Sequence, residues 1–252
     1  LGLYGPSSVA MSADARVVAI STAASLVPQD TDEVDLYVVD CGTSQWTRVD
    51  RSVLFGGYEV ASRQGTLRPE IIGISDDGRF VGVILRWYGG SISFPLALVR
   101  YDRQTNTRDV LYDSRSGNVG STSMSRDGRT FAWLATQTDP PIVDPPQKVY
   151  ARVVGGPVQE AGSSCTGWQP GSPRSCQAGL AISGDGRHVV YTAAFNEATG
   201  AAPALAIVDL VSGARRYFPE AQGPQATNFT ASHILTGGGV FDVASRRLDP
   251  VA

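Results

Sequence analysis

The sequence predicts an all-β protein that folds as a β-propeller of four-stranded antiparallel blades. Three observations support this fold: an internal repeat, a high content of turn residues, and no helical periodicity sustained over windows of about 11 residues. Glycine and proline contribute 28 and 15 of the 252 residues, which suits many short strands better than long helices. We expect a single propeller domain over residues 1–252 with five blades, the alternative being six.

A short motif marks the repeat. It reads apolar-Ser-x-Asp-Gly-Arg and starts at Met11, Ile74, Met124 and Ile182, with alanine in place of glycine in the first copy. The serines of successive copies are 63, 50 and 58 residues apart. Aspartate can accept hydrogen bonds from backbone N–H groups of such a turn, and glycine can take a positive φ. Because the motif recurs in four blades, we expect these aspartates to be structural and not catalytic.

The segments around each motif have the composition of strands, with β-branched and aromatic residues bounded by turn residues. One strand leads into each motif, at Ser7–Met11, Ile71–Ile74, Gly120–Met124 and Ala178–Ile182. Three strands follow each motif: Val17–Ser21, Asp35–Asp40 and Gln45–Val49; then Phe80–Leu85, Leu96–Tyr101 and Arg108–Tyr112; then Thr130–Ala135, Lys148–Val154 and Val158–Ala161; and last His188–Ala193, Leu205–Leu210 and Arg215–Phe218. These strands predict blades at residues 5–50, 69–113, 119–161 and 178–219.

Residues 227–252 predict a compressed fifth blade that lacks the motif. Its four short strands are expected at Asn228–Ser232, His233–Thr236, Gly239–Val243 and Arg247–Val251. The stretches between them, rich in glycine and serine, supply tight turns.

The motif and the strands after it resemble the WD-like repeat of TolB-type β-propellers. The third strands Tyr37–Asp40 and Ala206–Asp209, each closed by a Thr/Ser-Gly type of turn, match that repeat best. The resemblance covers about residues 7–220 and implies an exported bacterial propeller, secreted or periplasmic. Members of that family serve as periplasmic interaction modules, as substrate-gating domains beside peptidases, and occasionally as enzymes. The resemblance is therefore specific for the fold and unspecific for the function.

Charge and hydropathy exclude several classes of protein. The 21 Lys and Arg against 24 Asp and Glu give a net charge of −3, which argues against a nucleic-acid partner because that calls for a clustered basic field. No apolar run approaches the ~20 residues needed to cross a bilayer, so we expect no transmembrane segment. Leu1 opens no signal-peptide pattern, so we expect an exported monomer whose export signal has already been removed.

The predicted loops divide the propeller into a plain end and an elaborated end. The turns within each motif, and those between the third and fourth strands, are tight and lie at one end. The remaining connections are long and irregular: Thr22–Val34, Arg51–Pro69, Trp87–Phe94, Gln137–Gln147, Gly162–Gln177, Phe195–Pro203 and Pro219–Thr227. Rigid scaffolds carry recognition on such loops, so we expect binding at the elaborated end.

Several residues at that end are candidates for partner contacts. Arg86, Trp87 and Tyr88 are of the types enriched at interface hot spots, although they could instead cap the sheet. Further aromatic candidates are Phe55 and Tyr58 in the first crossing and Trp168 in a later loop. Asp139 and Asp144 flank a four-proline loop that either presents a stiff recognition edge or simply rigidifies a long connection. Trp46 and Trp133 fall inside strands and are expected to be packing residues.

Asp30, Asp32 and Asp35 are candidate calcium ligands. Asp-x-Asp-x-x-Asp places three carboxylates within six residues, and Ca²⁺ takes several oxygen ligands from such loops. The pattern lacks the glycine and the distal glutamate of an EF-hand, and a solvated acidic loop explains it as well. Calcium is the only cofactor that the sequence suggests.

The chain has three cysteines, too few for a disulfide scaffold. Cys165 and Cys176 bracket a loop rich in glycine, proline and serine, and we expect a disulfide between them, which suits an oxidising compartment. Cys41 lies in a turn and is expected to be a lone thiol.

The sequence favours a binding module over an enzyme. It has no Gly-x-Ser-x-Gly elbow, and the strands that lead into the motifs contain no carboxylate, Glu70 lying just before the second of them. We therefore predict a non-enzymatic, exported β-propeller that binds a protein or glycan through its long-loop end. The alternatives are a metal-dependent carbohydrate-active enzyme that uses Asp30 and Asp32, and the regulatory propeller of a larger protein.

Overall fold

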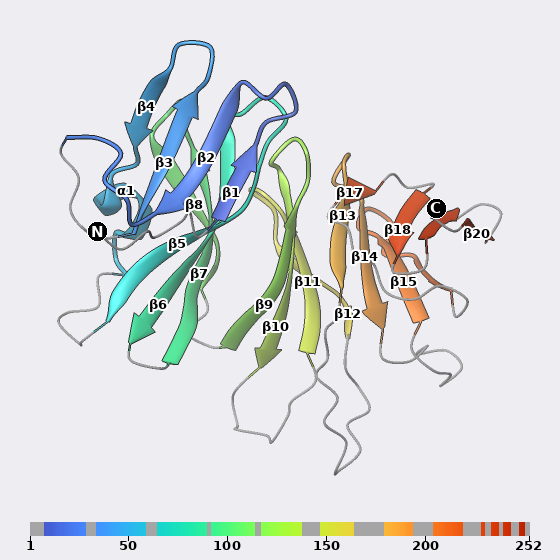
Figure 1. Cartoon of the computed structure of the whole chain (residues 1–252). Coiled ribbons are helices and arrows are strands. Elements are labelled where there is room, and N and C mark those ends of the chain that lie inside the picture. Colours follow the sequence, from blue (N-terminus) through green and yellow to red (C-terminus); the bar gives the residue numbers. More distant parts are fainter. Residues whose placement is uncertain are drawn as a thin grey trace. The chain divides into compact units, whose positions relative to one another are not determined.

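The computed structural model describes residues 8–28, 34–58, 65–89, 92–113, 117–137, 147–163, 179–193, 204–218, 228–229, 233–236, 239–242 and 247–249. The chain divides into two compact units, Leu1–Arg115 and Ser116–Ala252, which are described separately. Both units are built from antiparallel sheets that follow one another along the chain (Figure 1).

The first unit contains two four-stranded meanders, with strand orders β1-β2-β3-β4 and β5-β6-β7-β8. The strands of the first sheet are β1 (Ser8–Met11), β2 (Val17–Thr22), β3 (Asp35–Asp40) and β4 (Gln45–Arg48). Those of the second are β5 (Thr66–Ile74), β6 (Phe80–Gly89), β7 (Ile92–Asp102) and β8 (Thr107–Asp113). A five-residue helix, α1 (Arg51–Phe55), lies between the two sheets in sequence, and Asp50 caps it by accepting from the Ser52 N–H.

The second unit contains two further meanders and a smaller sheet. The first meander comprises β9 (Gly117–Met124), β10 (Thr130–Gln137), β11 (Gln147–Val153) and β12 (Val158–Ser163). The second comprises β13 (Leu180–Ser183), β14 (His188–Ala193), β15 (Ala204–Asp209) and β16 (Arg215–Phe218), and β17 (Asn228–Phe229) joins it. The small sheet has three strands, β18 (His233–Thr236), β19 (Gly239–Asp242) and β20 (Arg247–Asp249).

The prediction of repeated antiparallel four-stranded sheets is confirmed, with two differences in detail. The segment expected to open a fifth four-stranded blade instead adds β17 to the fourth sheet, pairing in parallel with β13 at Ile182–Asn228. The C-terminal sheet consequently has three described strands. Helix α1 replaces part of a predicted loop. It is the only helix among the described residues, and nothing in that part of the chain is a helix long and apolar enough to span a membrane.

The Ser-x-Asp-Gly-Arg motif forms the turn between the first two strands of each four-stranded sheet. In the second copy the Ser75 hydroxyl donates to Asp77 at 2.5 Å, and the Arg79 N–H donates to the same carboxylate oxygen at 3.0 Å. The Phe80 N–H donates back to the Ser75 hydroxyl at 2.9 Å, and Gly78 has φ +71°. The same bonds recur in the other three copies, so the predicted structural role of the motif is confirmed.

The motif glycine also lets neighbouring sheets pack closely. A Cβ on Gly78 would lie 2.6 Å from the Val17 side chain of the preceding sheet, and a Cβ on Gly186 would lie 2.4 Å from Thr130. Val17 and Thr130 occupy the same position, directly after the motif arginine of the preceding copy. Each of these glycines therefore lets its sheet approach the one before it in the same unit.

The cores lie between sheets. In the first unit, the core joins Val17, Leu36 and Val38 of sheet β1–β4 to Val81 and Val99 of sheet β5–β8. In the second unit, an equivalent core lies between sheets β9–β12 and β13–β16, and Ile234 of β18 packs on the far face of the latter. Trp133 is fully buried, which confirms its prediction as a packing residue.

Candidate functional site

Sheet β5–β8 has longer strands than the other sheets at one of its ends. We call the end of each sheet that holds the motif turn its turn end, and the opposite end its loop end. Strands β5, β6 and β7 have 9, 10 and 11 residues, against 4, 6 and 6 for their counterparts in sheet β13–β16. The extra residues are at the loop end, where β6 and β7 form a long hairpin (Figure 1).

This hairpin corrects the prediction that Trp87–Phe94 is a loop. Trp87 and Phe94 are opposite one another on β6 and β7, and their rings stack with centroids 4.8 Å apart. The Trp87 ring packs so closely on Gly65 and Gly89 that a Cβ on either glycine would lie within 2.5 Å of it. Trp87 is partly buried against the core of the first unit, whereas Phe94 remains 43% exposed. The aromatic residues therefore extend the strands and leave one ring facing solvent.

The other face of the hairpin carries a group of polar residues, which we call the Glu70 cluster: Arg68 and Glu70 on β5, and Arg86 and Tyr88 on β6. The Glu70 carboxylate accepts a hydrogen bond from Arg86 Nε at 3.0 Å and a second one from the Tyr88 hydroxyl. The Arg68 guanidinium lies over the Tyr88 ring, 4.7 Å from its centroid. Burial, together with the hydrogen bond to Glu70, raises the pKa of Tyr88, so its hydroxyl stays protonated at neutral pH.

The sequence predicted Arg86, Trp87 and Tyr88 as partner contacts but did not predict Glu70, Arg68 or Phe94. Glu70 was expected just outside the strand, whereas β5 begins at Thr66 and contains it. The signal that could have found it is the alternation Leu67-Arg68-Pro69-Glu70-Ile71, which places both charged residues on one face of an extended strand.

Tyr58 and Phe55 do not lie on an exposed surface. Tyr58 is 9% exposed and Phe55 2%, and both belong to the core of the first unit. The Arg108 guanidinium covers the Tyr58 ring at 5.3 Å and donates to the carbonyl groups of Leu54 and Gly56 at the end of α1. Tyr58 is therefore a packing residue, and we leave it out of the contact surface.

Asp35 is buried in β3 and bound by arginines. Its carboxylate accepts from Arg51 at 3.0 Å and lies 3.7 Å from Arg48, and its side chain has no exposed surface. Two guanidiniums already supply the countercharge that a cation would bring. Asp30 and Asp32 lie outside the described residues, within which no three potential ligands gather as a metal site. Calcium binding thus stays a prediction.

Five further candidates lie outside the described residues: Asp139, Asp144, Trp168, Cys165 and Cys176. Their assignments as partner contacts and as a disulfide stay predictions. Cys41 is described, and it is an exposed free thiol in the turn between β3 and β4.

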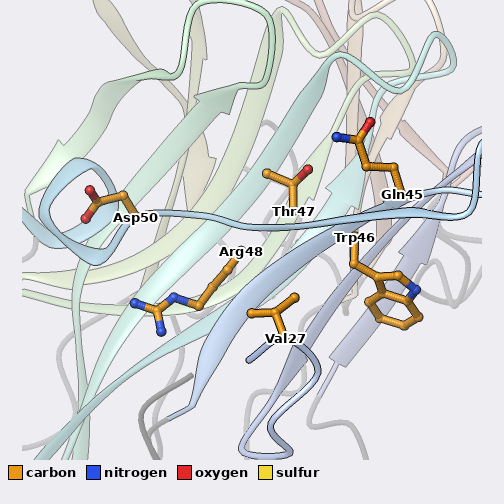
Figure 2. A pocket seen from close by; sticks show the side chains of 6 residues that line it. All are labelled: Val27, Gln45, Trp46, Thr47, Arg48 and Asp50. Carbon is orange, nitrogen blue, oxygen red and sulfur yellow. The ribbon is translucent and has the colours of Figure 1, made fainter. Parts of the chain in front are cut away.

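A shallow hollow of about 500 Å³ lies over the outer strand β4, lined by Val27, Gln45, Trp46, Thr47, Arg48 and Asp50 (Figure 2). Trp46 is 42% exposed, so the prediction that it is a packing residue within its strand is wrong. Figure 2 shows Trp46 and Arg48 on one side of β4 and Gln45 and Thr47 on the other, as strand alternation requires.

The position of the hollow explains the exposure of Trp46. Trp46 shares a sheet face with Val9, Met11 and Val18. Met11 pairs with Val18, Val18 with Val39 and Val39 with Trp46, and Val9 lies two residues before Met11 on the same strand. The equivalent of Val18 is Val81 in sheet β5–β8, which is buried against the preceding sheet. No other described sheet of the first unit covers this face of β1–β4, and Val9 and Met11 are 54% and 58% exposed. The hollow therefore lies on an open apolar sheet face, and we do not treat it as a ligand pocket.

Comparison with known proteins identifies the architecture. No protein-family model matches the sequence, and no curated protein matches it. Among solved structures, a chain of the nidogen/laminin complex is 13% identical with a TM-score of 0.51, covering 95% of this chain and 76% of that one. A putative TolB from Agrobacterium tumefaciens is 14% identical with a TM-score of 0.46, covering 85% of this chain and 65% of that one. A prolyl endopeptidase is 12% identical with a TM-score of 0.47, covering 100% of this chain and 34% of that one. At such identities the likeness concerns the fold alone, and the match to the chain of the nidogen/laminin complex, together with the repeated four-stranded antiparallel sheets, confirms the β-propeller fold.

Proposed function

We propose that this chain is an exported, non-catalytic β-propeller of the TolB-like type that binds a protein partner through the loop end of sheet β5–β8. The observation that carries the proposal is the stacked pair at the end of the longest hairpin. There Phe94 is 43% exposed on top of Trp87, itself seated on two glycines. Phe94 keeps 43% of its surface in solvent, and burying that part in a complex contributes about 1–2 kcal/mol, less than the ~1.5–3 kcal/mol of a fully exposed side chain.

The hairpin that carries Phe94 and the strand beside it have the composition of a binding hot spot. Tyrosine, tryptophan and arginine dominate such sites; here Trp87 lies on the same face as Phe94, and Tyr88, Arg86 and Arg68 lie on the opposite face. These side chains are fixed by stacking and by the hydrogen bonds to Glu70, so little conformational entropy is lost when a partner binds.

The bonding of Glu70 supports a role in recognition in preference to catalysis. Glycosidic chemistry on a propeller requires carboxylates that are free to donate a proton or to attack. Both oxygens of Glu70 are already engaged, one by Arg86 and the other by Tyr88. This is the bonding of a carboxylate that organises neighbouring side chains.

The test is a cross-linked capture from envelope and extracellular extracts of the producing organism. The baits are the wild-type chain, Phe94→Ser and a matched control, Val211→Ser. Val211 is also an exposed apolar residue, 80% exposed, but it lies at the turn end of sheet β13–β16. Circular dichroism of all three chains establishes that each is folded before capture.

We expect a protein that the wild type and Val211→Ser recover and that Phe94→Ser loses by about tenfold or more, which corresponds to the burial of one aromatic side chain. The proposal fails if the wild type recovers no protein after cross-linking. It fails equally if Phe94→Ser recovers the same proteins in the same amounts.

A further inference from the structure

The Glu70 cluster carries one positive charge that it does not neutralise. Arg68 and Arg86 contribute two positive charges, Glu70 contributes one negative charge, and the neutral Tyr88 contributes none. Glu70 is bound to Arg86, with Nε to Oε2 at 3.0 Å, and to the Tyr88 hydroxyl. The carboxylate is therefore fully used, and within the cluster Arg68 is left with only the face of the Tyr88 ring.

Arg68 also has a buried N–H group without an acceptor. Its Nε is buried, and no oxygen within the described part of the chain accepts a hydrogen bond from it. A buried donor left in this state costs about 1–3 kcal/mol, and native proteins keep such groups rarely. Where they do, an ordered water, an ion or a ligand generally supplies the missing acceptor.

The pairing of the strands increases this cost. Arg68 on β5 and Arg86 on β6 are directly opposite one another in the register. Like charges at such positions destabilise a sheet, and the one carboxylate of the cluster is bonded to Arg86 and to Tyr88. The free protein therefore keeps an arrangement that a second carboxylate would relieve.

We propose that the loop end of sheet β5–β8 binds an acidic peptide segment of its protein partner, with Arg68 as the residue that binds a partner carboxylate. This inference rests on the proposed function and names the chemistry of the partner. Trp87 and Phe94 lie on one face of sheet β5–β8, and Arg68 lies on the opposite face. A peptide segment bound across the loop end of this sheet would contact an apolar face and a cationic face, which favours acidic and apolar residues in alternation.

The test measures peptide binding to the full chain by calorimetry at low ionic strength, where charge pairing is least screened. The probe is the hexapeptide Glu-Leu-Glu-Leu-Glu-Leu, compared with the same peptide carrying glutamine in place of glutamate. The variants are Arg68→Met, which removes the charge and keeps the stem, and Arg68→Lys, which keeps the charge. The control is Arg16→Met, an arginine at the turn end whose side chain is 62% exposed.

We expect the wild type and Arg16→Met to bind the glutamate peptide about tenfold more tightly than the glutamine peptide, as one charge-assisted hydrogen bond requires. Arg68→Met should lose this tenfold preference, and Arg68→Lys should keep part of it. The acidic-peptide inference is overturned if the wild type does not distinguish the two peptides, or if Arg68→Met distinguishes them as well as the wild type does. It is also overturned if a uronate trisaccharide binds more tightly than the glutamate peptide, because the ligand would then be a glycan.

Failure here is distinguishable from failure of the proposed function. If capture by the wild type is lost with Phe94→Ser and kept with Arg68→Met, the protein partner stands and the acidic segment does not. If Phe94→Ser captures the same proteins as the wild type, the partner-binding role itself has failed.

Discussion

Sheets β5–β8 and β13–β16 have the same turn end and different loop ends. In both, the motif arginine pairs with the aspartate that ends the third strand, Arg79 with Asp102 and Arg187 with Asp209, each at 2.7 Å. In both, the motif glycine contacts the preceding sheet of its own unit. Only sheet β5–β8 continues into a long hairpin with stacked aromatic rings and a charged cluster. The repeated half of the sheet accounts for the fold, and the unrepeated half is where a specific function can reside.

The turn end and the loop end also differ in whether their charged and apolar groups have favourable partners. At the turn end every charged group described above has an opposite charge or a backbone donor as its partner. At the loop end of β5–β8, two arginines are opposite one another and a phenylalanine faces water. Natural proteins keep such locally unfavourable arrangements mainly at functional sites.

The largest effect is expected from Gly78→Ala, which tests whether the shared turn end holds the fold. The new Cβ would lie 2.6 Å from Val17 in a residue with φ +71°, so we expect a loss of about 2–5 kcal/mol in the free energy of unfolding, measured by urea denaturation. Gly213→Ala is the matched control, because Gly213 has the same φ of +71° and no atom within 4 Å of the added Cβ. It should cost only about 1–2 kcal/mol. Equal losses in the two variants would show that the contact between sheets contributes nothing.

A smaller effect is expected from Glu70→Gln, at the unrepeated end. The substitution leaves two opposed guanidiniums without a countercharge, so we expect a loss of about 1–2 kcal/mol in the same measurement. Adding Arg68→Met to Glu70→Gln should recover part of the loss, because it removes one of the two like charges. If the double variant is less stable than the single one by the full effect of Arg68→Met alone, the two arginines do not repel each other.

A pH titration tests a feature that both sheets share. Hydrogen bonds from Arg79 lower the pKa of Asp102 from its ordinary value of 3.8 to about 2. Because this pKa is lower in the folded protein, the ionised Asp102 stabilises the fold. That contribution is complete above about pH 4 and is lost as the pH falls through about 2. The pKa of Asp209 is lowered by Arg187 in the same way.

We therefore expect the free energy of unfolding to fall between about pH 4 and pH 2, and the fall to be shallower in Arg79→Gln. Arg16→Gln is the control, since the Arg16 side chain is 62% exposed and lies 3.8 Å from Asp40, so this variant should change the slope much less than Arg79→Gln does. A slope in Arg79→Gln as steep as that of the wild type would contradict the assignment.

The smallest effect on stability is expected from Phe94→Ser. Since the ring is 43% exposed and its main contact is Trp87, we expect a loss of about 0.5–1 kcal/mol. Thermal unfolding followed by circular dichroism measures it. Phe218→Ser, in a residue 4% exposed on β16, should cost about 3–5 kcal/mol. A large loss in Phe94→Ser would make Phe94 a core residue and remove the contrast between the two sheets.

The parts of the fold that the sequence predicted are those set by local chemistry. The turn motif carries its own hydrogen bonds within six residues, so four copies sufficed to place the turns and the strands beside them. The parts that it did not predict depend on partners distant in sequence. Glu70 binds Arg86, sixteen residues away, and Asp35 binds Arg51, also sixteen residues away. An Asp-x-Asp-x-x-Asp spacing cannot show that an arginine already neutralises its last member.

Trp46 shows a second limit of the sequence. Its strand was predicted, and the alternation along β4 was readable, but its exposure depends on whether another sheet covers that face. The equivalent position in sheet β5–β8 is Arg108, which reaches the end of α1. A tryptophan and an arginine at the same register position thus have different environments for a reason outside their own sheet.

The contact between Gly78 and Val17 has a consequence for how such repeats diverge. Because Gly78 meets Val17 and Gly186 meets Thr130, each the residue after the arginine of the preceding copy, the two positions of each pair should vary together among homologues, a larger residue at one being tolerated only with a smaller one at the other. The coupling applies only where two sheets pack in this way. A motif position that meets no such residue can lose its glycine at the cost of the positive φ alone. Ala15, at φ 57°, shows that a residue other than glycine can hold this turn conformation.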